Sequence, residues 1–187
     1  MTQPASHDRP SSDAVSGPNR RLIGQARALV ATLDDDRFCA SDPRRSSVGA
    51  HLRHVIDCYR CFLRGLGEGR IDYDGRQRDA GIECDRQVAA DALANLEAGF
   101  GALPVDLERP LEVRVDAAAW GSSLHWQQST LGRELQFLVS HTVHHFALIA
   151  LLLRAQGFEP DAEFGVAPST LEHRATDGEE TATACAR

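Results

Sequence analysis

The fold is decided by residues 129–156, STLGRELQFLVSHTVHHFALIALLLRAQ, the segment of the chain with the strongest helical periodicity. Apolar side chains recur there at spacings of three and four residues. The face that they define comprises Leu135, Leu138, Thr142, His145, Ile149 and Leu152. Gly157 follows, and glycine commonly ends a helix. The segment therefore predicts a long helix with one buried face, which also carries several histidines.

Three earlier segments show the same period, at residues 20–33, about 47–66 and about 85–103. Pro18 precedes the first, Ser46 or Ser47 can cap the second, and Pro104 ends the third. Apolar and polar residues alternate over 111–115, and a short run at 124–127 can return beside them as a hairpin. The predicted fold class is all-α, a four-helix bundle with a short β-hairpin inserted before the last helix. The long connection between the second and third helices leaves the chain topology open.

The domain organisation predicted from composition is one bundle domain, residues 19–171, between two polar tails. Residues 1–18 and 172–187 contain few large apolar side chains, so they cannot bury enough surface to offset the entropy of ordering. Both tails are predicted to be disordered and dispensable for folding.

Charge and cysteine content narrow the class of protein. The net charge is -7, and all 20 basic residues are arginine, which disfavours nucleic acid as a partner. No uninterrupted apolar run reaches the roughly 18 residues that cross a bilayer, and residues 1–19 lack a signal pattern. An odd number of cysteines without dense spacing predicts reduced thiols. We therefore expect a cytoplasmic protein without a membrane or nucleic-acid partner.

The histidines predict a metal site. His141 and His145 are four residues apart on the last helix, so their side chains stack about 6 Å apart along its axis. A third ligand can come from the second helix, which offers His51 and His54. Three neutral nitrogens leave one position for water or substrate, as in open zinc sites, although nickel, cobalt or iron can also bind nitrogen ligands. A lone helical histidine is more often a surface or satisfied core residue, but a buried cluster of unpaired imidazoles is costly.

Ser47 followed by His54, and then His141-Thr-Val-His-His145 on the last helix, resemble the DinB-like superfamily of metal-binding four-helix bundles. The resemblance covers roughly residues 20–154. It implies one histidine ligand on the second helix and a His-x-x-x-His pair on the last, which carries over to His54, His141 and His145. The spacing from Ser47 favours His54 over His51. Some members are thiol-dependent transferases or isomerases, and members often form homodimers.

Four neighbouring residues have both a functional and an ordinary interpretation. His144 points about 100 degrees away from His145 and can act as an acid or base at the rim, or lie on the surface. His51 can flank the pocket or lie on a solvated face. Cys58 can approach the metal and favour softer ions, or fill the core. Glu134 can support the site through a hydrogen bond, or be a solvated charge at the start of the helix.

Two functions follow from these residues. In the first, a divalent metal ion, with zinc or nickel as the first candidates, lowers the pKa of a bound low-molecular-weight thiol or water, which then attacks a small electrophilic substrate. In the second, the metal holds the bundle together or supports binding without catalysis. A closed shell of four protein ligands favours the second function, whereas three histidines and an exchangeable water favour the first.

Overall fold

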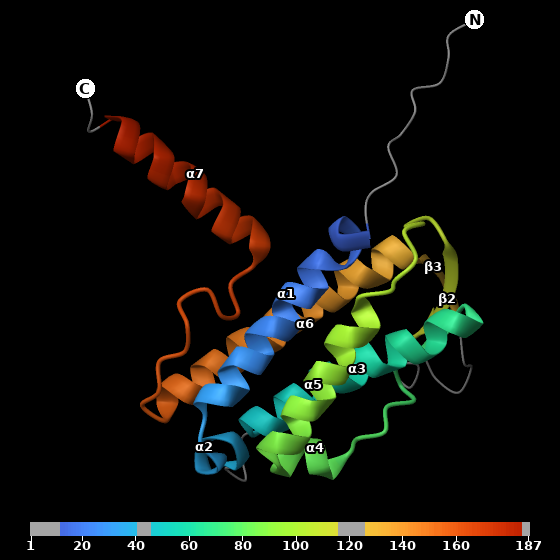
Figure 1. Cartoon of the computed structure of the whole chain (residues 1–187), viewed down its shortest axis with the longest axis horizontal. Coiled ribbons are helices and arrows are strands. Elements are labelled where there is room, and N and C mark those ends of the chain that lie inside the picture. The colour runs from blue at the N-terminus through green and yellow to red at the C-terminus, as the bar shows by residue number, and fades with distance from the viewer. Residues whose placement is uncertain (1–11, 41–45, 116–125, 185–187) are drawn as a thin grey trace, which may run out of the picture.

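The computed structural model describes residues 12–40, 46–115 and 126–184 (Figure 1). The chain order of its elements is α1 (Ser12–Thr32), α2 (Asp35–Cys39), α3 (Val48–Glu68), β1 (Arg70–Asp72), α4 (Ala80–Cys84), α5 (Arg86–Phe100), β2 (Pro110–Arg114), β3 (Gln127–Thr130), α6 (Leu131–Ala155) and α7 (Pro168–Ala184).

The predicted four-helix bundle is confirmed, and it consists of α1, α3, α5 and α6 (Figure 1). Both α1 and α3 pack against α5 and α6. The first two long helices therefore lie at opposite corners of the bundle, although they follow each other in the chain. Because α3 and α6 are neighbours, the two histidine-bearing helices face each other.

The ends of the site helices follow the local sequence. Ser47 caps α3, since its Oγ accepts a hydrogen bond from the backbone N–H of Ala50 at 2.9 Å. Gly69 ends α3 with a φ of 73°, a left-handed conformation that costs glycine little. Thr130 caps α6, which starts at Leu131 and not at residue 129. These caps fix where each histidine lies along its helix.

A three-stranded sheet replaces the simple hairpin predicted from the sequence. Strands β2 and β3 are antiparallel, as expected, with Leu111 opposite Ser129. The returning strand is residues 127–130, and residues 124 and 125 of the predicted run lie outside the described residues. Strand β1 pairs in parallel with β2, which places Ile71 opposite Val113. A three-residue strand is too short to show periodicity, so this pairing was not predicted.

The predicted start of the first helix after Pro18 was wrong. Helix α1 begins at Ser12, and Pro18 lies inside it. Val15 and Ser16 are buried, and Asn19 donates from Nδ2 to the carbonyl oxygen of Leu135 on α6 at 3.2 Å. Packing against α6 therefore outweighs the hydrogen bond that proline cannot donate. Residues 12–18 belong to the bundle and not to a disordered tail, whereas residues 1–11 lie outside the described part.

The C-terminal segment also differs from the expectation of disorder from residue 172. Residues 168–184 form α7, which projects away from the bundle (Figure 1). Its described side chains are mostly exposed, and Leu171 is the single large apolar residue in its sequence. A helix with so little apolar surface can contribute little to the core.

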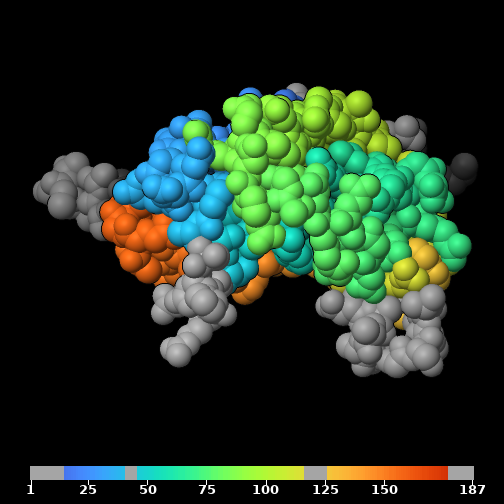
Figure 2. Space-filling view, turned by 90° about the horizontal axis from the view of Figure 1, so that it is seen from below, coloured from blue at the N-terminus to red at the C-terminus, as the bar shows by residue number. Residues whose placement is uncertain are grey.

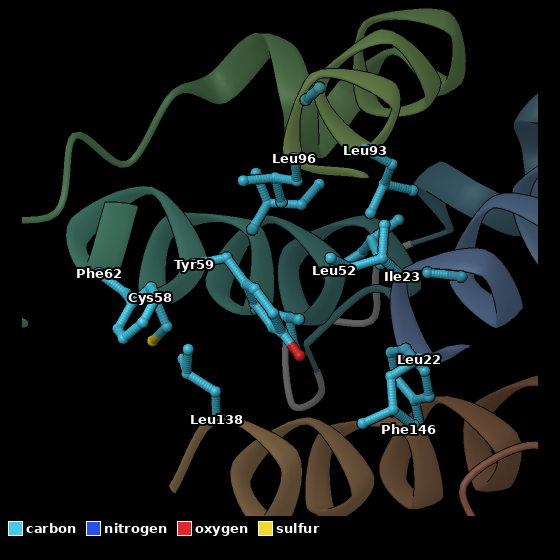
Figure 3. Packing of buried hydrophobic residues seen from close by; sticks show 14 of the residues in the cluster. Leu22, Ile23, Leu52, Cys58, Tyr59, Phe62, Leu93, Leu96, Leu138 and Phe146 are labelled. Carbon is cyan, nitrogen blue, oxygen red and sulfur yellow. The ribbon is translucent and has the colours of Figure 1, made fainter. Parts of the chain in front are cut away.

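The core is formed by side chains that the four long helices direct inward (Figure 3). Leu22 and Ile23 come from α1, Leu93 and Leu96 from α5, and Leu138 from α6. On α5, Ala89 is buried, whereas Val88 is exposed. In the space-filling view from below, α4 and α5 lie across the middle of the molecule, beside visible parts of α3 (Figure 2).

Helix α6 is long and apolar enough, by length and composition, to cross a membrane. The same property is found in central helices of bundles that do not enter a membrane. Here Leu135, Leu138, Phe146, Ile149 and Leu153 of α6 are buried against the rest of the bundle. Packing within the chain therefore accounts for one face of α6, whereas Leu151 on another face is 61% exposed.

Close packing at the C-terminal end of α3 gives a first prediction. A Cβ atom at Gly65 would overlap the carbonyl oxygen of Arg70 and lie 2.8 Å from Ile71 Cα, whereas one at Gly67 would meet nothing within 4 Å. We expect Gly65→Ala to lower the free energy of unfolding by about 1–3 kcal/mol, because the obstructing atoms belong to backbone. Gly67→Ala in the same helix should raise it by up to about 1 kcal/mol. Urea unfolding of both variants checks this prediction, which equal effects would contradict.

Candidate metal centre

The candidate centre lies between α3 and α6, where three imidazole rings meet. The ring centroids of His54 and His141 are 4.9 Å apart. The ring of His145 lies 4.6 Å from each of them. The three residues singled out in the sequence therefore come together, one from α3 and two from successive turns of α6. Each is half-buried, which leaves part of the cluster accessible.

The nitrogen atoms of His54 and His141 already point toward each other. Their Nε2 atoms are 2.8 Å apart, and the Cys58 sulfur is 4.0 Å from the same His54 nitrogen. One donor atom from each of His54, Cys58 and His141 lies within 4.8 Å of the others. Such a set could hold a metal ion, although Cys58 replaces the expected His145 in it.

His145 lies beside this donor group but turns a nitrogen toward another residue. Its Nδ1 is 3.0 Å from Nδ1 of His51, one turn before His54 on α3. Because its ring centroid remains 4.6 Å from both His54 and His141, rotation about the Cβ–Cγ bond can redirect a nitrogen toward them. His51 therefore lies at the edge of the cluster, next to His145. It is a neighbour of the histidines that are predicted to bind metal.

The donor set fits a divalent metal ion of borderline softness. Two nitrogens bound to one zinc ion, each at roughly 2.0–2.1 Å, lie about 3.3 Å apart in a tetrahedral shell. The 2.8 Å separation of His54 and His141 is somewhat shorter, so a small opening of the pair is sufficient to admit an ion. Imidazole and thiol donors suit zinc, nickel or cobalt better than magnesium or calcium, which prefer oxygen.

Burial keeps the imidazoles in the form that binds metals. It lowers the pKa of His54 to about 4, assisted by the nearby charges of Arg76 and His141. Burial also lowers the pKa of His145 to about 3, with further contributions from His141 and His54. Metal ligation requires a neutral imidazole, and both side chains are therefore deprotonated at neutral pH.

A cationic side chain borders the donor group. Arg76, in the segment between β1 and α4, is close enough to Cys58 for its charge to lower the pKa of that thiol. Burial raises the pKa of Cys58 to about 11, and the Arg76 guanidinium opposes that rise. Asp57, the neighbour of Cys58 on α3, is also buried, and its pKa is raised by burial. Arg76 therefore brings positive charge to a largely desolvated thiol.

Glu134 is buried, which excludes the interpretation of it as a solvated charge at the start of the helix. Only 1 % of its surface is exposed. Its carboxylate accepts hydrogen bonds from the Tyr73 hydroxyl at 2.9 Å, the Ser129 hydroxyl at 2.5 Å and the Arg133 guanidinium at 3.3 Å. Burial, together with the adjacent Glu134 carboxylate, raises the pKa of Tyr73, which therefore remains a donor. The carboxylate thus joins the sheet to α6.

Phe137 connects this carboxylate network to the histidines. Its ring packs against Tyr73 with centroids 5.0 Å apart, and it stacks on His141 at 5.3 Å. The Glu134 network is therefore connected to the cluster through the rings of Tyr73 and Phe137. A cavity of about 190 Å³ lies on the same side, lined in part by Tyr73, Arg133, Glu134 and Phe137.

His144 was considered as a rim residue, and its ring lies edge-on to His145 with centroids 5.3 Å apart.

Two residues of the site were not predicted from the sequence. Arg76 and Phe137 were missed altogether. The i, i+4 spacing of Phe137 and His141 on α6 was a signal that could have identified the stacked pair. No local pattern indicates Arg76, because its position depends on how the segment after β1 folds back onto α3.

A known structure has a similar fold. A structure search matches YfiT from Bacillus subtilis, described as a probable metal-dependent hydrolase with an unusual four-helix bundle topology. The match has a TM-score of 0.59 and 14% identity, and it covers 85% of this chain and 95% of that one. At this identity the likeness shows the fold alone, which agrees with the bundle described above.

A sequence relative and a family model complete the comparison. FK506-binding protein 5 from Rhizopus delemar is 32% identical over 104 residues, which are 55% of this chain and 27% of that protein. The chain therefore matches about a quarter of the length of that curated relative. The model of the DinB superfamily matches residues 20–149, a range that includes α3, the histidine-bearing part of α6 and most of the bundle. The chain belongs to the DinB superfamily.

Proposed function

We propose that this chain is a divalent-metal-dependent enzyme in which a low-molecular-weight thiol or water attacks a small electrophilic substrate. The observation that carries the proposal is the meeting of His54, His141 and His145, with ring centroids 4.6–4.9 Å apart, on two facing helices. Zinc and nickel are the metals that we propose first. A divalent ion there would lower the pKa of a bound thiol or water and supply a nucleophile at neutral pH.

The surroundings of the cluster support a reaction with a small molecule. The three histidines are half-buried and thus partly accessible, and Phe137, which stacks on His141, lines the cavity of about 190 Å³. Arg133 lies over the Phe137 ring at 5.5 Å, and the charge of Arg76 acts on His54. Arginine binds carboxylate well, which suits thiols that carry carboxylate groups. We also propose a cytoplasmic location and a homodimer, with neither membrane nor nucleic acid as a partner.

The competing proposal is a metal centre that stabilises the bundle or supports binding without catalysis. The approach of the Cys58 sulfur to the donor group favours it, because a fourth protein ligand leaves less room for exchange. YfiT is described as a probable metal-dependent hydrolase, which supports the enzymatic proposal by analogy of fold. Experiment has to separate the two.

Screening of metal-loaded protein against thiols and hydrolysable substrates tests the proposed function. We expect one of glutathione, mycothiol or bacillithiol, or a hydrolysable ester or amide, to raise the melting temperature in proportion to its occupancy. The same compound should support turnover. Both effects should disappear in His54→Ala, because the proposed co-substrate binds through the metal.

Matched measurements decide between the enzyme and the structural centre. His144→Ala is the control, since its ring lies beside His145 at the edge of the cluster. The structural or binding role would be favoured if none of these compounds shifted the melting temperature of the metal-loaded protein and none was turned over. A shift that persists in His54→Ala would place the ligand elsewhere on the protein.

A further inference from the structure

The donor group at the cluster contains a thiol as well as imidazoles. Cys58 lies one turn after His54 on α3, and its Sγ is 4.0 Å from His54 Nε2. Its donor atom and those of His54 and His141 all lie within 4.8 Å of one another. Only 2 % of the residue is exposed, and Figure 3 shows its sulfur directed from α3 toward α6 on the side of Leu138. The sulfur therefore points into the helix interface that holds the histidines.

We propose that Cys58 is a metal ligand, so that the centre is a mixed imidazole–thiolate site selective for zinc, cobalt or similar ions over ions that prefer oxygen. The inference rests on the proposed metal site and adds a ligand to its three histidines. Sulfur bonds to zinc at about 2.3 Å, longer than nitrogen, so Cys58 can remain farther from the ion than the histidines do. With Cys58 as a fourth protein ligand, a thiol or substrate would have to enter as a fifth ligand, and a centre that does not admit one would have the structural or binding role.

Charge supports a thiolate at this position. The histidines contribute no negative charge when neutral, and Arg76 adds a positive charge beside them. A divalent ion would therefore experience repulsion from Arg76 unless an anion lay close to both. Cys58 is close to both, because the charge of Arg76 acts on its thiol and its sulfur lies 4.0 Å from His54 Nε2. A thiolate there would be attracted by both positive charges.

The neighbouring cysteine shows that burial on α3 does not by itself create a ligand. Cys61 lies one turn further along and is as buried as Cys58, at 2 % exposed. Its sulfur accepts a hydrogen bond from Arg64 at 3.4 Å, and its donor atom is outside the group formed by His54, Cys58 and His141. Cys61 therefore serves as a matched control for any substitution of Cys58.

Coordination by Cys58 has a simple balance. The S–H bond breaks, a sulfur–metal bond forms, and the proton passes to solvent, with no change in the oxidation state of sulfur or metal. Binding of one divalent ion should therefore release one more proton from wild-type protein than from a variant without Cys58. This difference can be measured without any enzymatic assay.

Cobalt(II) is the probe for the test, because its visible bands report binding and a near-ultraviolet charge-transfer band reports a thiolate ligand. Full-length wild type, Cys58→Ala and Cys61→Ala would be loaded with cobalt, and circular dichroism would verify their folding. We expect wild type and Cys61→Ala to show both signals, and Cys58→Ala to show the visible bands without the charge-transfer band. Calorimetry in buffers of different ionisation enthalpy should find one proton fewer released by Cys58→Ala.

The possible outcomes separate this inference from the proposed metal site. Visible bands without a charge-transfer band in wild type would overturn Cys58 ligation and leave the histidine site standing. A charge-transfer band that persists in Cys58→Ala would assign the thiolate to another cysteine and would also overturn it. Failure of the wild-type protein to bind cobalt would contradict both the Cys58 ligand and the proposed metal site. If Cys58→Ala does not fold, Cys58→Ser takes its place, because a serine hydroxyl gives no thiolate charge-transfer band; retention of the band in that variant would overturn Cys58 ligation.

Discussion

Replacing His141 with alanine is expected to reduce the metal content from about one ion per chain to a small fraction of that value, whereas replacing His144 should leave it unchanged. His141 Nε2 lies 2.8 Å from His54 Nε2, at the centre of the donor group. Structural zinc sites bind with about 10–16 kcal/mol, so loss of one of four ligands costs roughly 3 kcal/mol, or about a hundred-fold in affinity. Elemental analysis of protein purified without a histidine tag would measure this loss.

His144 and His51 make the comparison specific. His144 lies three residues after His141 on the same helix, so His144→Ala controls for helix propensity and for loss of an imidazole. His51 is a neighbour of His145 at 3.0 Å and is expected to contribute little to retention. Loss of metal in His51→Ala but not in His54→Ala would assign the α3 ligand to His51. Full retention in His141→Ala would contradict the proposed site.

The histidine cluster was accessible from the sequence because each of its parts depends on local spacing. His141 and His145 are one helical turn apart wherever that segment is helical, and Ser47 fixes the start of α3 and hence the phase of His54. The remaining step, that the two helices face each other, came from the resemblance to a family. Spacing within each helix does not determine which helices are neighbours in the bundle, and here α1 and α3 are not.

Features that depend on tertiary packing were missed for physical reasons. Pro18 predicts a helix boundary by itself, yet α1 continues through it, with Val15 buried and Asn19 donating a hydrogen bond to Leu135 of α6. Strand β1 exists because its three residues pair with β2, not because of their own propensity. Arg76 reaches Cys58 only after the chain has turned back from β1. Each depends on contacts between segments that are distant in sequence.

Removal of the Glu134 carboxylate is expected to have the largest effect on stability. The side chain is 1 % exposed and accepts hydrogen bonds from Tyr73, Ser129 and Arg133. A hydrogen bond to a charged group contributes about 1.5–3 kcal/mol, and a buried hydroxyl left without an acceptor costs a further 1–3 kcal/mol or so. We therefore expect Glu134→Ala to lower the free energy of unfolding by about 3 kcal/mol or more in chemical denaturation.

Glu134→Gln is the matched variant, because the amide oxygen can still accept from the buried Tyr73 hydroxyl while the amide nitrogen faces Ser129. Its expected loss is about 1 kcal/mol, since one acceptor remains and the contact with exposed Arg133 is weak. If Glu134 were a solvated charge at the start of α6, both variants would lie within about 0.5 kcal/mol of wild type.

Glu134→Ala should also weaken metal binding, because Tyr73 packs against Phe137, which stacks on His141. Unchanged metal affinity alongside a large loss of stability would show that Glu134 supports the sheet and not the metal centre.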